Sequence, residues 1–233
     1  MIFENKGEMI RMNKVIPALD VGKEQAFELV RKLNEVSEFL AGLKVGSLLV
    51  YENGVSIIQE IKDLIDTPII FDGQKFGTDI PDIAAEQVEL LASAGADQII
   101  ACPMGAGPET LKAFTESCFA NQATPVCVVE MTHPKASVYL RTFAAGRILK
   151  DALEFGIRNF VYPATKPGTL RSHMGILNVQ ENVILKATGF KVQGGSLPEL
   201  RDLGVTEFIV GRAIYDAVDP VQAVLDLSKE ING

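Results

Sequence analysis

Eight short apolar runs, spaced fairly evenly along the chain, constrain the fold more than any other feature of the sequence. Runs of this kind, rich in Val, Ile and Leu, are typical of strands that are buried on both faces, as a parallel sheet requires. The predicted strands are Val15–Leu19, Gly42–Gly46, Pro68–Phe71, Gln98–Ala101, Pro125–Val129, Asn159–Tyr162, Val183–Ala187 and Glu207–Val210.

Stretches with helical spacing of apolar residues lie between these runs. The predicted helices are Glu24–Asn34, Gly54–Ile65, Pro81–Ala94, Pro108–Phe119, Ala144–Phe155 and Pro220–Glu230. Eight strand–helix alternations without a wide linker indicate an α/β fold, a single-domain (β/α)8 TIM barrel, and favour it over a flavodoxin-like open sheet. The 233 residues are near the roughly 250 usual for such a barrel. We expect residues 1–13 to be an N-terminal extension and residues 14–233 to form the catalytic barrel.

The charge of the chain excludes some classes of partner. A net charge of −8 and a pI of about 4.9 argue against a general surface for nucleic acid or for an anionic membrane, since both need a basic face. The sequence shows no signal peptide and no spanning run of apolar residues. Cys102, Cys118 and Cys127 have no C-x-x-C spacing, which is typical of reduced thiols in a cytoplasmic protein.

Charged residues gather where the predicted strands end, which is where barrels of this kind carry out chemistry. Asp72, Lys75 and Asp79 follow the third strand. Lys44 lies among strand-forming residues, so we expect a carboxylate partner, for which Asp72 is the natural candidate. Asp20 follows the first strand and, taken alone, is typical of a helix cap.

The last two strand ends together predict a phosphate site. Gln193, Gly194 and Gly195 follow the seventh strand, and Gly211 and Arg212 follow the eighth. Barrels commonly hold phosphate at these two positions, with backbone N–H groups and a bidentate Arg as donors. The two histidines, His133 and His173, are too isolated in the sequence to indicate a metal site or a catalytic triad.

The order and spacing of these motifs resemble the orotidine 5'-phosphate decarboxylase family, archaeal type, from Val15 onward. The motifs are Ala18-Leu19-Asp20, Leu43-Lys44-Val45-Gly46, Asp79-Ile80-Pro81, Met131-Thr132-His133-Pro134, Pro163-Ala164-Thr165-Lys166-Pro167, Gln193-Gly194-Gly195 and Ile209-Val210-Gly211-Arg212-Ala213-Ile214-Tyr215. The resemblance implies decarboxylation of orotidine monophosphate (OMP) to uridine monophosphate (UMP) in de novo pyrimidine biosynthesis, without metal or cofactor. It also implies a homodimer with its sites near the subunit interface.

By the same resemblance, four charged residues form the catalytic tetrad: Lys44, Asp72, Lys75 and Asp79. Lys75 would donate the proton, and Asp79 would come from the partner chain. The implied substrate-binding residues are Asp20 and Lys44 for the ribose, Thr132 for the pyrimidine edge, Gln193, Gly211 and Arg212 for the phosphate, and Ile80.

Three features depart from the family pattern. The usual spacing Asp-x-Lys-x-x-Asp is one residue longer in each gap between Asp72, Lys75 and Asp79, so a bulge or early turn is needed to keep the side chains on one face. Ile83 replaces a Thr that reaches across the interface in the family, and Thr188-Gly189 replaces Pro-Gly.

Two other functions fit the same patterns. The first is a Mg2+-dependent phosphosugar enzyme on a related barrel, such as a keto-gulonate-phosphate decarboxylase or a hexulose-phosphate synthase, with the metal near the carboxylates of the third strand. The second is a non-catalytic phosphate-binding barrel that binds UMP without converting OMP.

Overall fold

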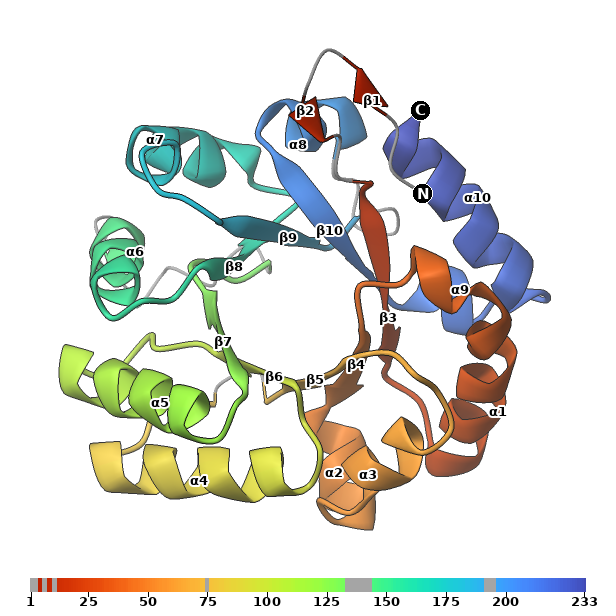
Figure 1. Cartoon of the computed structure of the whole chain (residues 1–233), viewed down its shortest axis with the longest axis horizontal. Helices are drawn as coiled ribbons and strands as arrows, with labels where there is room; N and C mark the ends of the chain where they lie inside the picture. Colours follow the sequence, from red (N-terminus) through yellow and green to blue (C-terminus); the bar gives the residue numbers. More distant parts are fainter. Residues whose placement is uncertain (1–3, 6–7, 10–11, 74–75, 133–143, 191–195) are drawn as a thin grey trace.

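Eight parallel strands close into a barrel in the computed structural model, which describes residues 4–5, 8–9, 12–73, 76–132, 144–190 and 196–233. The strands are β3 (Lys14–Leu19), β4 (Leu43–Gly46), β5 (Ile69–Asp72), β6 (Gln98–Ala101), β7 (Thr124–Val128), β8 (Asn159–Pro163), β9 (Ile184–Thr188) and β10 (Val205–Val210). β10 pairs with β3 and so completes the ring, which helices surround (Figure 1). The predicted TIM barrel is confirmed, and each predicted strand lies within two residues of an observed one.

The helices in the described part of the chain include the predicted ones and several others. They are α1 (Lys23–Leu33), the 3-10 helix η1 (Asn34–Phe39), α2 (Ser47–Asn53), α3 (Ile57–Lys62), α4 (Pro81–Ser93), α5 (Pro108–Ala120), α6 (Ala144–Glu154), α7 (Pro167–Leu177), α8 (Leu197–Asp202), α9 (Arg212–Tyr215) and α10 (Pro220–Asn232).

The helix predicted at Gly54–Ile65 is partly wrong. Gly54 does not begin a helix but ends α2, with a φ of 79° in the left-handed region that favours glycine. The shorter α3 then begins at Ile57.

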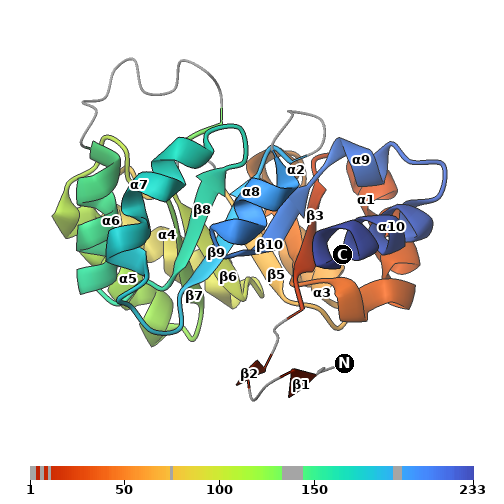
Figure 2. The same cartoon turned by 90° about the horizontal axis from the view of Figure 1, so that it is seen from above.

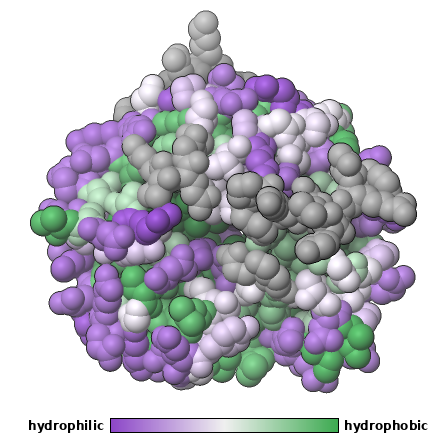
Figure 3. Space-filling model, turned by 180° about the vertical axis from the view of Figure 1, so that it is seen from behind, coloured by the Kyte–Doolittle hydropathy of each residue, from purple (hydrophilic) through white to green (hydrophobic). Residues whose placement is uncertain are grey.

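The carboxyl ends of the barrel strands lie on the side opposite the small antiparallel pair β1 (Glu4–Asn5) and β2 (Glu8–Met9), as Figure 2 shows. The face seen from behind in Figure 3 carries hydrophilic and hydrophobic residues side by side. No helix in the described ranges is both long and apolar enough to cross a membrane.

Alternate side chains of each strand point into the barrel, and the others pack against the helices. The interior cluster is aliphatic and includes Ile16, Ile70, Ile100, Val126 and Ile209. A larger cluster fills the space between strands and helices. The apolar side chains of the interior cluster pack in the centre of the barrel.

An ion pair lies buried among these side chains. Lys186 of β9 is fully buried and pairs with Glu207 of β10, which is 7% exposed. The two residues are register partners on neighbouring strands. Glu207 is two residues from Ile209 of the interior cluster, so it faces the inside of the barrel.

Glu207→Leu should lower the free energy of unfolding by about 3–5 kcal/mol, because it removes the carboxylate that pairs with the fully buried Lys186 ammonium. The double variant Lys186→Met/Glu207→Leu should recover most of that loss, since an apolar pair of similar volume replaces the ion pair. Urea denaturation checks both values. Glu116→Leu, which breaks the exposed Lys112–Glu116 pair, is the control and should change stability by about 0.5 kcal/mol or less. Equal losses for the single and double variants would contradict this account.

Candidate active site

A cavity of about 250 Å3 opens at the carboxyl ends of the strands. Its wall includes six residues that the sequence predicted as site residues: Asp20, Lys44, Asp72, Thr132, Gly211 and Arg212. Aliphatic side chains of the barrel interior, among them Ile100 and Val161, also line the cavity. Polar groups from widely separated parts of the sequence therefore meet on an apolar base.

An ammonium group lies between two carboxylates in the wall of the cavity. The Nζ of Lys44 lies 3.1 Å from Oδ1 of Asp20 and 3.1 Å from Oδ2 of Asp72. Lys44 and Asp72 are each 5% exposed, whereas half of the Asp20 side chain is exposed. Burial disfavours the charged form of Lys44, but the two carboxylates outweigh burial and raise the pKa of Lys44 above its ordinary value.

The strand register explains why these three residues meet. Ala18 pairs with Lys44, and Lys44 pairs with Ile70. Asp20 and Asp72 each come two residues after one of these partners and so lie on the same face as Lys44. The predicted pairing of Lys44 with Asp72 is confirmed. The helix-cap interpretation of Asp20 is wrong, because Gly22 is the N-cap of α1 and Asp20 binds Lys44 instead.

Two glycines leave room for side chains at the cavity, one for the Asp20 carboxylate and one for the Tyr215 ring. A Cβ on Gly46 would lie 2.9 Å from Oδ1 of Asp20, closer than side chains normally approach. A Cβ on Gly211 would lie 3.2 Å from the Tyr215 ring and 3.8 Å from Oδ2 of Asp20. Gly46 thus leaves room for Asp20 to reach Lys44, whereas Gly211 leaves room for the Tyr215 ring.

The segment after β5 is fixed to its neighbours at Phe76. The Phe76 ring makes edge-to-face contacts with Phe71 and Phe114, at centroid distances of 5.6 and 6.2 Å. The backbone carbonyl of Phe76 accepts a hydrogen bond of 2.9 Å from the N–H of Cys102. Gly77 follows with a φ of 76°, at a place where a Cβ would lie 2.8 Å from that of Ala101. The proposed proton donor, Lys75, lies outside the described residues.

Asp79 and Ile80 do not line the cavity of their own chain. Asp79 is exposed, and its carboxylate accepts a 2.8 Å hydrogen bond from the N–H of Ile80. Its carbonyl accepts another from Thr110 on α5. Ile80 is 61% exposed at the start of α4. Within one chain, the structure therefore brings together Lys44, Asp20 and Asp72 but not Asp79.

At the end of β10, Gly211 and the exposed Arg212 line the cavity together with Tyr215. Burial, followed by the nearby carboxylate of Asp20, raises the pKa of the Tyr215 hydroxyl. Gln193 and the two glycines that follow it, which complete the predicted phosphate site, lie outside the described residues, as does His133.

The sequence patterns missed a polar cluster beside the cavity. Glu130 and Met131 line the cavity next to Thr132, and Glu130 pairs with Lys166 at a distance of 3.0 Å. A single acidic residue after a strand is ordinary in a loop, so the sequence carries no signal that would single out Glu130.

The part of the chain that the structure describes offers no cluster of metal-ligating side chains. No group of three or more His, Cys, Asp or Glu side chains among the described residues is arranged to hold a metal ion. Of the carboxylates that line the cavity, Glu130 pairs with Lys166, and the ammonium of Lys44 occupies the space between Asp20 and Asp72. A cation there would have to displace Lys44.

Comparisons with known proteins identify the family of the chain. The sequence model of the Orotidine 5'-phosphate decarboxylase / HUMPS family matches residues 13–227, which is nearly the whole chain. The chain belongs to this family. The expectation of an enzyme of the orotidine 5'-phosphate decarboxylase family, drawn from the sequence motifs, is thus confirmed.

Two curated members of the orotidine 5'-phosphate decarboxylase family show how closely the chain resembles its relatives. An orotidine 5'-phosphate decarboxylase from Methanosarcina mazei is 32% identical over 223 residues, covering 96% of this chain and 97% of that protein. The one from Methanococcoides burtonii is 33% identical over 228 residues, covering 96% of this chain and all of that protein.

Solved structures of the family have the same fold. The orotidine 5'-monophosphate decarboxylase of Methanocaldococcus jannaschii, in complex with the inhibitor BMP, superposes with a TM-score of 0.84 at 26% identity and covers 96% of this chain and all of that one. The enzyme from Pyrococcus horikoshii gives a TM-score of 0.80 at 29% identity over 94% of this chain and 99% of that one.

A hydrogen-bonded aromatic pair lies behind the cavity wall. The Tyr162 hydroxyl lies 3.0 Å from Nδ1 of His173, and both residues are buried. Burial lowers the pKa of His173, while the charge of Glu130 acts in the opposite direction. The folded protein therefore binds a proton at His173 less readily than the unfolded chain does.

Folding lowers the pKa of His173 below its value in the unfolded chain, which is about 6.5. The stability that the neutral His173 contributes is therefore present above a pH of about 6.5, and it is lost as the pH falls through the lower pKa of the folded state. The free energy of unfolding should therefore decrease between pH 7 and pH 5.5 more steeply in the wild type than in His173→Phe. Urea denaturation at a series of pH values measures both slopes. Parallel curves would show that His173 does not contribute to the pH dependence.

Proposed function

We propose that this protein decarboxylates OMP to UMP. The observation that carries the proposal is the buried Lys44 ammonium, 3.1 Å from Asp20 and 3.1 Å from Asp72, in a cavity that also contains Arg212. Alternating charges fixed before the substrate arrives suit a reaction whose transition state develops charge, because they need no rearrangement during the reaction. The printed names of the relatives from Methanosarcina mazei and Methanococcoides burtonii point to the same reaction.

Loss of CO2 from OMP leaves a carbanion on the pyrimidine ring. We propose that Lys75, after β5, stabilises this charge and then protonates the carbon, as the family resemblance implies. Asp72 is the described carboxylate closest to Lys75 in the sequence and is held in place by Lys44. No metal or cofactor takes part in this mechanism.

The rest of the cavity would hold the remainder of the nucleotide. Arg212 and Gly211, together with Gln193, would bind the phosphate, and Asp20 with Lys44 would bind the ribose hydroxyls. Thr132 would bond the pyrimidine edge. Binding energy from the phosphate, far from the reacting carbon, is then available to stabilise the transition state.

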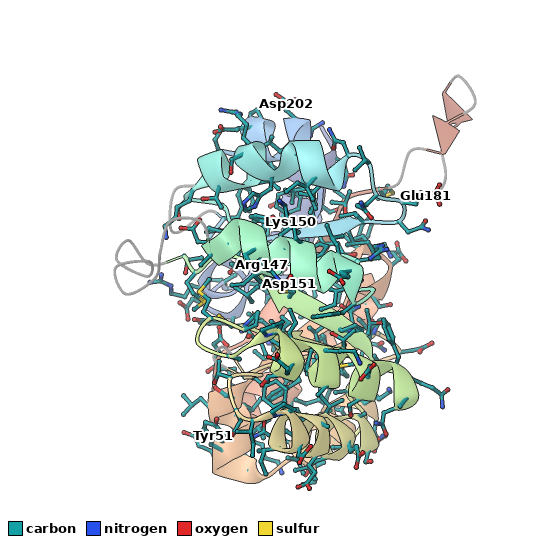
Figure 4. The ribbon with its side chains drawn as sticks, turned by 90° about the vertical axis from the view of Figure 1, so that its left-hand side faces the viewer. Tyr51, Arg147, Lys150, Asp151, Glu181 and Asp202 are labelled. Carbon is teal, nitrogen blue, oxygen red and sulfur yellow. The ribbon has the colours of Figure 1, made fainter. Side chains whose placement is uncertain are left out.

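We also propose a homodimer in which Asp79 and Ile80 complete the partner's site. Four large apolar residues on neighbouring elements are exposed: Leu48 and Tyr51 on α2, and Ile80 and Ile83 at the start of α4. Tyr51, 80% exposed, lies at the edge of the molecule in Figure 4. α2 and α4 follow the paired strands β4 and β5, so a partner there would cover apolar surface next to Asp79. Ile83, where the family has Thr, suits an apolar contact.

A place in de novo pyrimidine biosynthesis follows from the proposed reaction, and a cytoplasmic location stays a prediction from the sequence. The matched family is named for a second group, HUMPS, as well as for orotidine 5'-phosphate decarboxylase. The Mg2+-dependent alternative therefore needs an experimental test, which is given below. The position of Lys44 between two carboxylates argues against it, because a metal ion needs those oxygens as ligands.

Purified protein treated with a chelator should convert OMP to UMP, followed by the change in pyrimidine absorbance. Lys75→Ala should lower kcat by at least about 100-fold, because the proton donor is lost, while UMP binding stays close to that of the wild type. Lys150→Ala, on the exposed face of α6, is the control and should leave kcat unchanged.

Activity on a phosphosugar that appears only with added Mg2+, without conversion of OMP, would favour the phosphosugar alternative. Binding of UMP without any turnover of OMP would favour a non-catalytic barrel. Substantial activity of Lys75→Ala would remove Lys75 from the mechanism.

A mixture of Lys75→Ala and Asp79→Asn subunits should regain activity if Asp79 acts across the interface. Half of the dimers in an equal mixture are hybrids, and each hybrid has one site with native Lys75 and native Asp79. The mixture should therefore reach about a quarter of wild-type activity, given a symmetric dimer. Each variant mixed with itself is the control. Activity no higher than the mean of the two parents would contradict a shared site.

A further inference from the structure

The carboxylate of Glu130 lies at the amino-terminal end of α7, beside the cavity. One oxygen accepts a hydrogen bond of 3.0 Å from Nζ of Lys166, which is the N-cap residue of α7. The other accepts a hydrogen bond from the hydroxyl of Thr169, in the first turn of the same helix. A negative charge at this end of a helix is favoured by the unpaired backbone N–H groups there. The α7 helix thus fixes the orientation of Glu130.

Lys166 also holds the backbone of the loop after β7. Its Nζ donates a hydrogen bond of 2.8 Å to the carbonyl of Met131. The hydroxyl of the preceding residue, Thr165, lies 3.5 Å from the carbonyl of Thr132, at the limit of a hydrogen bond. The segment that begins α7 therefore contacts three successive residues, from Glu130 to Thr132, all of which line the cavity.

This cluster is largely shielded from water. The side chains of Glu130 and Lys166 are 15% and 22% exposed. Ion pairs on the open surface contribute little, but a shielded pair with further hydrogen bonds holds its geometry more firmly. The buried Tyr162–His173 pair lies on β8 and α7, the elements joined by the segment that carries Lys166.

We propose that Glu130 and Lys166 are positioning residues that fix the loop carrying Thr132, and thereby set the recognition of the pyrimidine ring. This inference rests on the proposed function, in which Thr132 bonds the pyrimidine edge. Lys166 acts through the carbonyl of Met131 and the carboxylate of Glu130. The phosphate-binding groups follow other strands, so the ribose phosphate part of the ligand does not depend on this cluster.

UMP and ribose 5-phosphate, measured by calorimetry, separate the two parts of the ligand, because ribose 5-phosphate lacks the pyrimidine. Lys166→Met should weaken UMP binding by about tenfold, the equivalent of one lost hydrogen bond, and leave ribose 5-phosphate binding unchanged. Glu130→Gln, which keeps the size of the side chain but removes its charge, should act in the same direction.

Lys166→Arg should restore most of the UMP affinity, because it keeps the charge and the donors. Lys150→Met is the matched control: Lys150, labelled on α6 in Figure 4, is exposed and is not among the residues that line the cavity. It should change neither affinity. If Lys166→Met does not fold, Glu130→Gln and Lys166→Arg still give the comparison.

The ratio of the two affinities decides the outcome. If Lys166→Met and Glu130→Gln leave the ratio of UMP affinity to ribose 5-phosphate affinity unchanged, because neither affinity falls or both fall equally, the positioning role is overturned. A pair with a purely structural role would lower stability without a specific effect on binding of the pyrimidine. A wild type that binds UMP no better than ribose 5-phosphate would also overturn it. A wild type that prefers UMP but does not decarboxylate OMP would refute the proposed function while leaving the positioning of the base-binding loop intact.

Discussion

The contact of Lys44 with two carboxylates is the interaction on which the site depends. A buried ammonium is destabilising unless it is paired. Asp20, which follows β3, and Asp72, at the end of β5, pair with Lys44 from the two strands that flank β4. The barrel register places the three groups on one face, at the carboxyl ends of their strands and next to the apolar interior. The register of β3, β4 and β5 therefore determines both the closure of this part of the barrel and the meeting of the three charged groups.

The described part of the segment between Asp72 and Asp79 is anchored by a partly buried aromatic residue. Phe76 packs between Phe71 and Phe114, and Gly77 takes a left-handed conformation against Ala101. The backbone carbonyl of Phe76 is also bonded to the N–H of Cys102, just after β6. Asp72 stays within the strand, and Asp79 stays next to the start of α4.

Much of the fold could be predicted from the sequence, because buried parallel strands have an apolar signature and glycine marks several helix ends. The short helix α2 was missed, since Gly54 looks like a helix start when only periodicity is considered. In the site, Lys44 could be found because a lysine among strand formers needs an explanation. Glu130 and Lys166 could not, because their pairing joins residues far apart in sequence that each resemble ordinary loop residues.

A crystal structure of the protein with UMP bound tests the central claim most directly, through the distances from Nζ of Lys75. The account predicts that this atom lies within hydrogen-bond distance of Asp72 and of Asp79 of the partner subunit, facing the pyrimidine carbon that loses CO2. A Lys75 side chain directed into solvent in that complex would contradict the proposed mechanism and leave only a nucleotide-binding barrel.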